Sequence, residues 1–349
     1  MKYKIYKMYF KTGVRCGIGK IESNSIEIPS DIIFSAIINE ASKVDEKILK
    51  DILDSFKDRK ILLSDAFPFI DDEYLLPKPL ISFTKNDGDS SEKKLYKKIN
   101  HIPISDFNEY VSGNSDPQEI LNKTENLGLI QIDTKIQNRL EGDNEIYNLS
   151  YFRFNKNNGL YFILAFEDER LEKLLHNLIY SIGFTGIGGK KTSGLGKFEI
   201  VEKELPNSIL NKINLEKANM LLTSSMARED ELEKIDEDAN YALIRRGGFI
   251  YSESEIGRKK TVKRKRTMHF FKSGSIFNKK FEGDIFRVDD GFVHPVYRYG
   301  IPMWLEVWYE KLWNYIKNIR TSLYRKWWNF KEIWIYLWQK RRKSLYTRW

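Results

Sequence analysis

The chain has 349 residues, 41% of them hydrophobic, which is enough for two domains with separate cores. Its one cysteine, Cys16, excludes an intramolecular disulfide and fits a reducing, cytoplasmic setting. We expect neither a signal peptide nor a membrane-spanning helix, because the N-terminus alternates lysine with apolar residues and no long uncharged apolar run occurs.

The formal charge of +9 is concentrated at the C-terminus. Residues 308–349 contain eleven Lys and Arg and two Glu, which leaves 47 basic and 47 acidic residues in 1–307. All eight tryptophans lie from Trp304 onward. We therefore expect a boundary near Val307, and any nucleic-acid surface before it must be a local patch.

The first 83 residues predict strands and one helix. Residues 2–10 alternate in period two and predict a strand. After the glycines of "TGVRCGIGKIES", Ser30 is expected to cap a helix with an apolar face. "KILLSDAFPFI" predicts a short strand, and the prolines of "YLLPKPLISF" predict an edge strand or an extended connector.

Residues 84–146 are polar and poor in aromatic residues, which predicts either disorder or a functional protrusion. "LSYFRFNKNNGLYFILAFED" then predicts a hairpin that turns at "NKNNG". A helix over 169–180 and a strand at "KFEIVEKE" follow. The order strand, helix, strand occurs twice, which is the split βαβ, ferredoxin-like arrangement.

The residues after 205 predict a second α+β unit. "ANMLLTSSMA", "YALIRRGGFIYSE", "MHFFKSGSIF", "GDIFRVDD" and "PMWLEV" are expected to be strands, with a short acidic helix near 229–236. We expect this unit to be ferredoxin-like as well, a degenerate copy of the first in topology, although no sequence repeat is visible.

The stretch "GFTGIGGKKTSGLGKFEI" (183–200) has six glycines and three lysines between two apolar segments. Its spacing does not match a Walker A loop or a dinucleotide fingerprint, so nucleotide-cofactor binding is disfavoured. Glycines let backbone N–H groups point outward, and Lys190, Lys191 and Lys197 add charge for phosphates. Thr192 and Ser193 can donate hydroxyl bonds, which together suits a sugar-phosphate chain. The alternative is a simple turn with solvated lysines.

A glycine-rich loop after the second helix of a ferredoxin-like domain resembles the signature loop of the RAMP superfamily of CRISPR RNA-binding proteins. "IPSDIIFSAI", "LSDAFPF" with "YLLPKP", "GGKKTSGLGKFE", "SGSIFNKKFEGDI" and "PMWLEV" resemble, in this order, the fourth-numbered subunit family of type III-A Csm complexes. The resemblance covers residues 1–307.

This resemblance implies a non-catalytic antiviral subunit without a cofactor or a metal. Such a subunit grips the 5′ repeat-derived handle of the CRISPR RNA, and docks the large polymerase-like subunit and the backbone RAMP subunit. The implied handle contacts are Arg15, Gly186, Gly188, Gly189, Lys190, Lys191, Ser193, Gly194 and Gly196.

The resemblance also implies a thumb. "DTKIQNRLEGDNEIY" (133–147) resembles the RAMP thumb, which wedges into the guide–target duplex. Lys135 and Arg139 would touch phosphates there, and Ile136 would press on a flipped base. The alternative is a mobile surface loop.

Two further basic segments have alternatives. In "RRGGFIYSES", adjacent strand residues face opposite ways, so at most one of Arg245 and Arg246 reaches RNA, and an ion pair is the other reading. "GRKKTVKRKRT" (257–267) predicts a solvated hairpin loop or a phosphate-steering patch.

Catalysis is not predicted. The four histidines His101, His176, His269 and His294 lack metal-ligand spacing with one another or with Cys16. Asp31 follows the predicted cap, where an acid favours the helix dipole. The rival hypothesis is a RAMP endoribonuclease that uses His176 or His294.

The C-terminal residues 308–349 predict a basic, aromatic, amphipathic helix. Three hypotheses stay open: binding to an anionic membrane, binding to nucleic acid or a partner, or an extension without a selected function. No other membrane contact is expected. The predicted division is therefore 1–205 with a thumb insertion at about 84–147 and the glycine loop at 183–196, then 206–307, then 308–349.

Overall fold

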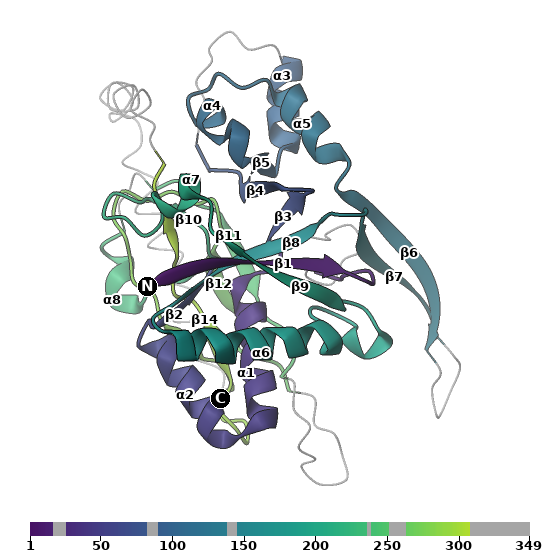
Figure 1. Cartoon of the computed structure of the whole chain (residues 1–349), viewed down its shortest axis with the longest axis vertical. Helices are drawn as coiled ribbons and strands as arrows, with labels where there is room; N and C mark the ends of the chain where they lie inside the picture. Colours follow the sequence, from purple (N-terminus) through teal and green to yellow (C-terminus); the bar gives the residue numbers. More distant parts are fainter. Residues whose placement is uncertain (17–25, 82–89, 138–144, 236–238, 251–262, 308–349) are drawn as a thin grey trace, which may run out of the picture. The chain divides into compact units, whose positions relative to one another are not determined.

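Strand β1 (Lys2–Phe10) lies inside the main sheet, as its alternating sequence predicted. It pairs antiparallel with β8 (Gly159–Phe166) on one side and with β9 (Phe198–Glu204) on the other (Figure 1). All of β8 is buried, which explains its continuous apolar sequence. The computed structural model describes residues 1–16, 26–81, 90–137, 145–235, 239–250 and 263–307. Residues 1–307 form one unit, and the C-terminal residues 308–349 lie outside the described residues.

The main sheet has the order β5–β4–β3–β8–β1–β9, and β2 also pairs with β8. Its shorter strands are β2 (Ile61–Leu63), β3 (Phe67–Ile70), β4 (Glu73–Pro77) and β5 (His101–Pro103). The four positions β2/β3, β8, β1 and β9 have the strand order of a split βαβ unit. The ferredoxin-like prediction for the first half is confirmed.

Helices α1 (Ser30–Val44) and α6 (Glu169–Thr185) lie together on the same side of this sheet, and α2 (Glu46–Lys57) packs on α1 (Figure 1). Asp168 caps α6 by accepting a hydrogen bond from the Leu171 N–H at 2.9 Å. Ser30 does not cap α1, because the helix already begins there. Instead, its N–H donates to the distant Asp65 carboxylate at 2.8 Å.

The predicted hairpin around "NKNNG" is wrong. Strand β7 (Glu145–Phe154) pairs with β6 (Gly128–Gln137) over ten residues, and β8 joins the main sheet. The signal in residues 155–159 marks a real turn, but the strands that it connects belong to different sheets. The β6–β7 hairpin projects away from the main sheet (Figure 1).

The described part of the polar segment 84–147 is folded. It contains small helices beside β4 and β5 before the chain enters β6 (Figure 1). These are α3 (Ser90–Lys98), the 3₁₀ turn η1 (Ile104–Asp106), α4 (Phe107–Val111) and α5 (Pro117–Glu125). Pro117 opens α5 directly after its cap, Asp116. A protrusion is thus present, but part of it is helical.

The second half differs from the predicted ferredoxin-like copy. Within its described residues the strands form three two-stranded ladders, β10–β15, β11–β12 and β13–β14, rather than one four-stranded sheet. The strands are β10 (Met220–Leu221), β11 (Leu243–Arg246), β12 (Met268–Phe271), β13 (Ile285–Arg287), β14 (Tyr297–Tyr299) and β15 (Trp304–Leu305). The helices are α7 (Asn207–Leu210) and α8 (Glu229–Leu232). An aromatic core with Phe271, Phe277, Phe281 and Trp304 holds the ladders together.

A fully buried carboxylate, Asp65, joins the two halves. It accepts hydrogen bonds from the Ser30 N–H and the Ser224 N–H, both at 2.8 Å, and from the Ser224 hydroxyl at 2.5 Å. Its own N–H donates to the Leu222 carbonyl at 2.8 Å. Burial raises the pKa of Asp65 to about 6, although these three donors oppose the shift.

Beside it, Asp31 is buried between two arginines of the second half. Arg246 donates to both carboxylate oxygens, at 2.7 and 3.2 Å, and Arg298 donates to one of them. The exposed fractions of Asp31 and Arg298 are 4% and 3%. Removing the charge of Asp31 or of Arg298 would leave its partner buried without full charge compensation.

Asp65→Asn is expected to change the pH dependence of stability. The pKa of Asp65 is near 3.8 in the unfolded chain and higher in the folded protein, so the folded state binds this proton more tightly. The free energy of unfolding therefore decreases as the pH rises from about 4 to 6. The loss is on the order of 3 kcal/mol. Asparagine keeps the acceptor oxygen and its NH₂ can donate to Ser224, so this variant should lose that pH dependence in urea unfolding at pH 4.5 and 7.5.

Asp65→Ala is the control for that experiment. It leaves three buried donors unsatisfied and should destabilise the protein at both pH values by about 2 kcal/mol or more. An Asn variant with the wild-type pH dependence would show that Asp65 does not titrate in this range.

Candidate RNA interface

The glycine loop begins where α6 ends and is built from left-handed backbone. Gly186, at the C-terminus of α6, has a φ of 83°, and Gly194 and Gly196 have φ values of 86° and 77°. Lys190 also adopts the left-handed conformation, with a φ of 61°, and a 3₁₀ turn, η2 (Lys191–Ser193), follows it. Only glycine adopts most of these angles at little cost, which explains its density here.

The loop is held against the segment 11–16 by backbone hydrogen bonds. Gly189 donates to the Arg15 carbonyl at 2.9 Å, and Gly196 donates to the Gly13 carbonyl at 2.8 Å. Ile187 donates to the Gly196 carbonyl at 3.0 Å, across the loop itself. These N–H groups are therefore used within the protein, which corrects the expectation that the glycines turn their N–H groups outward.

The same segment joins the loop to the base of the β6–β7 hairpin. Val14 and Phe152 exchange two backbone hydrogen bonds of 2.8 Å. Lys190 lies over the ring of Tyr147, with its ammonium nitrogen 4.8 Å from the ring centroid and 3.4 Å from the hydroxyl. Three predicted elements, the glycine turn, the glycine loop and the thumb, thus meet in one place.

Several positively charged side chains lie at this junction. Arg15, Lys190 and Lys197 have no carboxylate partner among the residues that the structure describes. Thr192 and Ser193 are exposed beside them and offer hydroxyl groups, and Lys191 is half-buried. A strand of phosphates is the kind of ligand that such a group of donors would attract.

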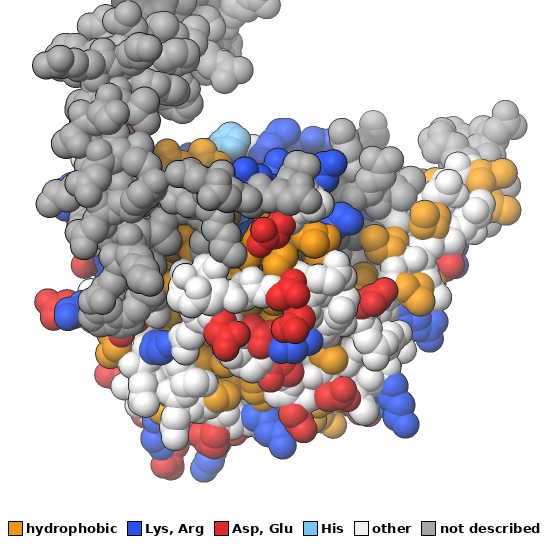
Figure 2. All heavy atoms as spheres, turned by 90° about the horizontal axis from the view of Figure 1, so that it is seen from above, with side chains coloured by type: hydrophobic (Ala, Val, Ile, Leu, Met, Phe, Trp, Pro, Cys, Tyr) orange, Lys and Arg blue, Asp and Glu red, His pale blue; other side chains and the backbone are white. Residues whose placement is uncertain are grey.

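The predicted thumb is the distal part of the β6–β7 hairpin. One face of this ribbon is apolar and exposed, since Ile136 and its cross-strand partner Ile146 are 64% and 72% exposed. Figure 2 shows hydrophobic side chains along the projecting arm. Lys135 lies on the opposite face, 3.4 Å from Asp133. Arg139 lies outside the described residues, and the RNA contacts of the thumb stay a prediction.

The two adjacent arginines of β11 have different surroundings. Arg246 points inward to Asp31, so the structure favours the ion-pair alternative for it, although the partner is on α1 rather than on a neighbouring strand. Arg245 is exposed on the other side of the ribbon. In the basic run 257–267, residues 263–265 pair with the segment after β11, Arg266 donates to the Val288 carbonyl, and residues 257–262 lie outside the described residues.

The histidines have structural surroundings. His101 is buried against Glu27, with 2.8 Å between its Nε2 and the carboxylate, and His176 lies 3.2 Å from Glu202. His269 is exposed and His294 is half-buried. No group of three His, Cys, Asp or Glu that could hold a metal ion occurs in the described ranges. Nor does any described helix have the length and apolarity to cross a bilayer.

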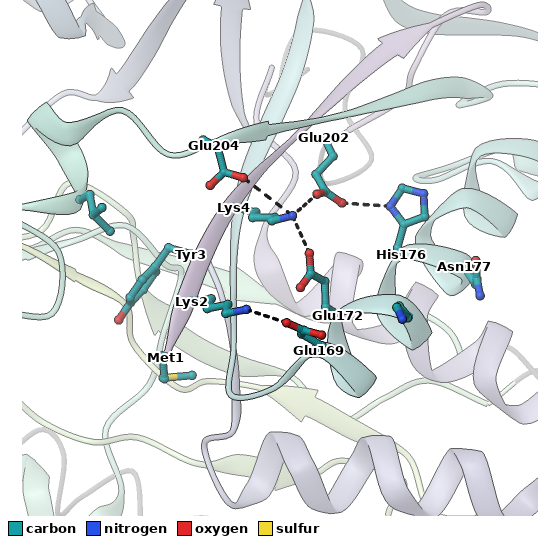
Figure 3. A pocket seen from close by; sticks show the side chains of 12 residues that line it. Met1, Lys2, Tyr3, Lys4, Glu169, Glu172, His176, Asn177, Glu202 and Glu204 are labelled. Atoms are coloured by element: carbon teal, nitrogen blue, oxygen red, sulfur yellow. Dashed lines mark hydrogen bonds and ion pairs between the residues drawn. The ribbon is translucent and has the colours of Figure 1, made fainter.

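A hollow at the opposite end of β1 and α6 is lined by charged side chains that pair with one another (Figure 3). Lys4 lies between Glu172 at 2.5 Å, Glu204 at 3.9 Å and Glu202, which also contacts His176. Hydrogen bonds to Glu172 and Glu202 raise the pKa of Lys4. Since these charges already satisfy one another, this hollow is a weaker candidate for an anionic ligand than the glycine loop.

Comparison with known proteins identifies matches along both halves of the described chain. The sequence model of the RAMP superfamily matches residues 10–199, and that of the CRISPR Csm4 C-terminal domain matches residues 214–307. The chain is 33% identical over 288 residues to the CRISPR system Cms protein Csm4 of Mycobacterium tuberculosis H37Rv, covering 82% of this chain and 91% of the relative. It is 31% identical over 319 residues to the protein of the same name from Streptococcus thermophilus, covering 88% and 99%.

Two solved structures are similar in fold. A crystal structure of a Csm3–Csm4 subcomplex of the type III-A CRISPR-Cas interference complex aligns with a TM-score of 0.59 and 23% identity, covering 87% of this chain and 99% of the other. A crystal structure of a Csm1–Csm4 cassette with cA4 aligns with a TM-score of 0.58 and 21% identity, covering 88% and 98%.

Gly196→Ala and Gly194→Ala are expected to differ in their effects on stability. A Cβ at Gly196 would lie 2.0 Å from the Ile187 carbonyl oxygen, whereas one at Gly194 meets no atom within 4 Å. Both positions have positive φ, which costs about 1 kcal/mol for alanine. Gly196→Ala should therefore lower the free energy of unfolding by more than about 2 kcal/mol and Gly194→Ala by about 1 kcal/mol, measured by urea denaturation. Equal losses would contradict the close approach of Gly196 to Ile187.

Proposed function

The chain belongs to the Csm4 family of the RAMP superfamily, and we propose that it is the subunit of a type III-A Csm complex that holds the 5′ handle of the CRISPR RNA. The observation that carries this proposal is the junction of the glycine loop, the segment 11–16 and strand β7 of the hairpin. Three basic side chains without carboxylate partners in the described chain lie there on a rigid backbone frame. Such a frame suits a chain of phosphates held without base recognition.

The handle contacts are made by side chains rather than by the glycines. Arg15, Lys190, Lys191 and Lys197 supply positive charge, and Ser193 supplies a hydroxyl donor. Gly186, Gly188 and Gly196 act indirectly, because a Cβ at each would lie within 2.7 Å of a backbone carbonyl oxygen. Their contribution is to bring the loop close to Arg15, which places these charges together.

Docking to two protein partners is part of the same proposal. The similar structures are named as a Csm3–Csm4 subcomplex and a Csm1–Csm4 cassette. This supports a backbone RAMP subunit and the large polymerase-like subunit as partners of this chain. The thumb, at the far end of the β6–β7 hairpin, would contact the guide–target duplex through Ile136 and Lys135. The two domain matches on either side of residues 200–213 support the proposed division at 205/206.

Replacing Lys190 and Lys191 together by alanine tests the handle site. We expect the affinity for a labelled single-stranded RNA that carries the repeat-derived 5′ segment to fall by about tenfold or more in a filter-binding assay. The slope of log K against log salt should decrease by about 1.4, since about 0.7 is lost for each phosphate contact on a single strand.

The matched control is Lys47→Ala with Lys50→Ala. Both lysines are exposed on α2, and the double variant removes the same net charge. An equal loss of affinity in both double variants would mean that only overall charge matters, and no loss in the first would reject the handle site.

The wild-type protein is expected not to cleave repeat RNA, since no acid–base pair in the described residues faces the glycine loop. Incubation of the purified chain with repeat RNA and analysis on a denaturing gel tests this. Cleavage that disappears in His176→Ala or His294→Ala would instead support the endoribonuclease hypothesis.

A further inference from the structure

The β11–β12 ribbon presents a second surface that the handle site does not use. Residues alternate between its two faces: Arg246 points inward to Asp31, and Leu243 and Arg245 point outward. His269, directly opposite Arg245, is exposed on the same outward face. This face is solvent-accessible, and Leu243 is 53% exposed.

A β-bulge in residues 265–267, opposite Gly247 and Gly248, opens a flat area on this face. Arg246 is paired with Met268, but Phe249 is paired with Arg264, so one strand advances three residues while the other advances four. Gly248 has a φ of 123°, and a Cβ built on it meets no atom within 4 Å. On this strand, no outward side chain stands between Arg245 and Phe249, and the Thr267 hydroxyl of the other strand borders Gly247.

The bulge is fixed from below. Arg298, which is buried, donates to the Gly247 carbonyl at 3.2 Å and to Asp31. The neighbouring Arg246 holds the same carboxylate through two hydrogen bonds. The flat area is therefore rigid before any ligand arrives, which lowers the entropic cost of binding.

An aromatic ring and a guanidinium border the flat area. Phe249 is 57% exposed, although it is large and apolar, and the guanidinium carbon of Arg264 lies 5.0 Å from its ring centroid. Both groups are planar, and RNA-binding proteins use aromatic rings and arginine planes to stack unpaired bases. The contact with Arg264 still leaves more than half of the Phe249 side chain exposed and open to a base.

The charge around this area is strongly positive. Arg245 and Arg264 have no carboxylate partner among the described residues. Beneath the flat area, Arg246 and Arg298 share one carboxylate, and burial together with the charge of Arg298 lowers the pKa of Lys265 to about 8. A ligand with phosphates relieves this excess, whereas a cationic or neutral partner does not.

The inward side of the ribbon is near the segment that holds the glycine loop. Burial raises the pKa of Cys16 to about 12, and the nearby charge of Arg246 opposes that shift. Cys16 follows Arg15, whose carbonyl accepts from the glycine loop.

We propose that the outward face of the β11–β12 ribbon is a stacking site for an unpaired RNA base, with Phe249 and Arg264 as its planar surfaces and Arg245 as a phosphate contact. This inference rests on the proposed RNA-binding function and assigns two parts of the RNA to two surfaces. The glycine loop holds the backbone of the strand, and the ribbon holds a base.

Phe249→Ala tests the site with two RNA probes of equal length and charge. One is an ordinary single-stranded RNA of mixed sequence, and the other has the same backbone with abasic riboses. The variant should bind the ordinary RNA at least about fivefold more weakly than the wild-type full-length chain, since stacking of a base on an aromatic side chain contributes this much. Binding of the abasic RNA and the salt dependence should not change, and Phe249→Tyr should restore affinity.

Tyr180→Ala is the matched control, because Tyr180 is an aromatic residue that is 55% exposed on α6 and lies outside both the glycine loop and this surface. It should bind both RNAs like the wild type. Equal loss of both RNAs in Phe249→Ala, or no loss, would overturn the stacking site. If Phe249→Ala binds normally while the Lys190 and Lys191 variant does not, the stacking site fails and the handle site stands.

Two other outcomes are informative. If the wild type binds neither RNA, the proposed function and the stacking site fail together. If Phe249→Ala keeps both RNAs but loses a co-purifying protein subunit, the surface is a protein interface and the stacking site is rejected. Photocrosslinking of 4-thiouridine RNA to the peptide that contains Phe249, located by mass spectrometry, would support the proposal independently.

Discussion

Two buried carboxylates at the first turn of α1 determine how the halves of the protein fit together. Asp65 binds the start of α1 and Ser224 of the second half, and Asp31 binds two arginines from β11 and β14. Burying a charge is unfavourable unless its partners are in place. Other positions of the second half would leave these carboxylates without their partners and are therefore disfavoured. The aromatic contacts of Tyr299 with Phe34 and Phe56 add apolar area at the same seam. The position of the β11–β12 ribbon against the first half therefore depends on this one helix terminus.

The glycine loop illustrates how a flexible sequence becomes a rigid element. Its glycines permit left-handed angles and close approach, and its N–H groups then bond to the segment 11–16. In the proposed RNA contact, backbone groups therefore fix the conformation of the loop, and the lysine, arginine and hydroxyl side chains face the ligand. The proposed stacking site uses glycine differently, because at Gly248 the missing side chain leaves open space instead of a close contact.

Features that depend on the local sequence pattern, such as individual strands and helices, could be predicted from the sequence. The alternation of residues 2–10, the helix before the glycine loop and the strand after it were predicted, and with them the ferredoxin-like order of the first half. Pairings over long separations could not be predicted. The turn at 155–159 gave a real local signal, but β8 pairs with β1, about 150 residues earlier, because its uniformly apolar sequence requires burial on both faces. Similarly, Arg246 and Asp31 are 215 residues apart, and nothing in either local sequence indicates the other.

The single cysteine directly follows Arg15 of the proposed handle site. Cys16 is fully enclosed, and its thiol keeps its proton at neutral pH, so electrophiles and oxidants cannot attack it in the closed protein. Alkylation of this thiol therefore requires a local opening of the segment 11–16. The rate at which Cys16 is alkylated would therefore report how often the segment 11–16 opens locally.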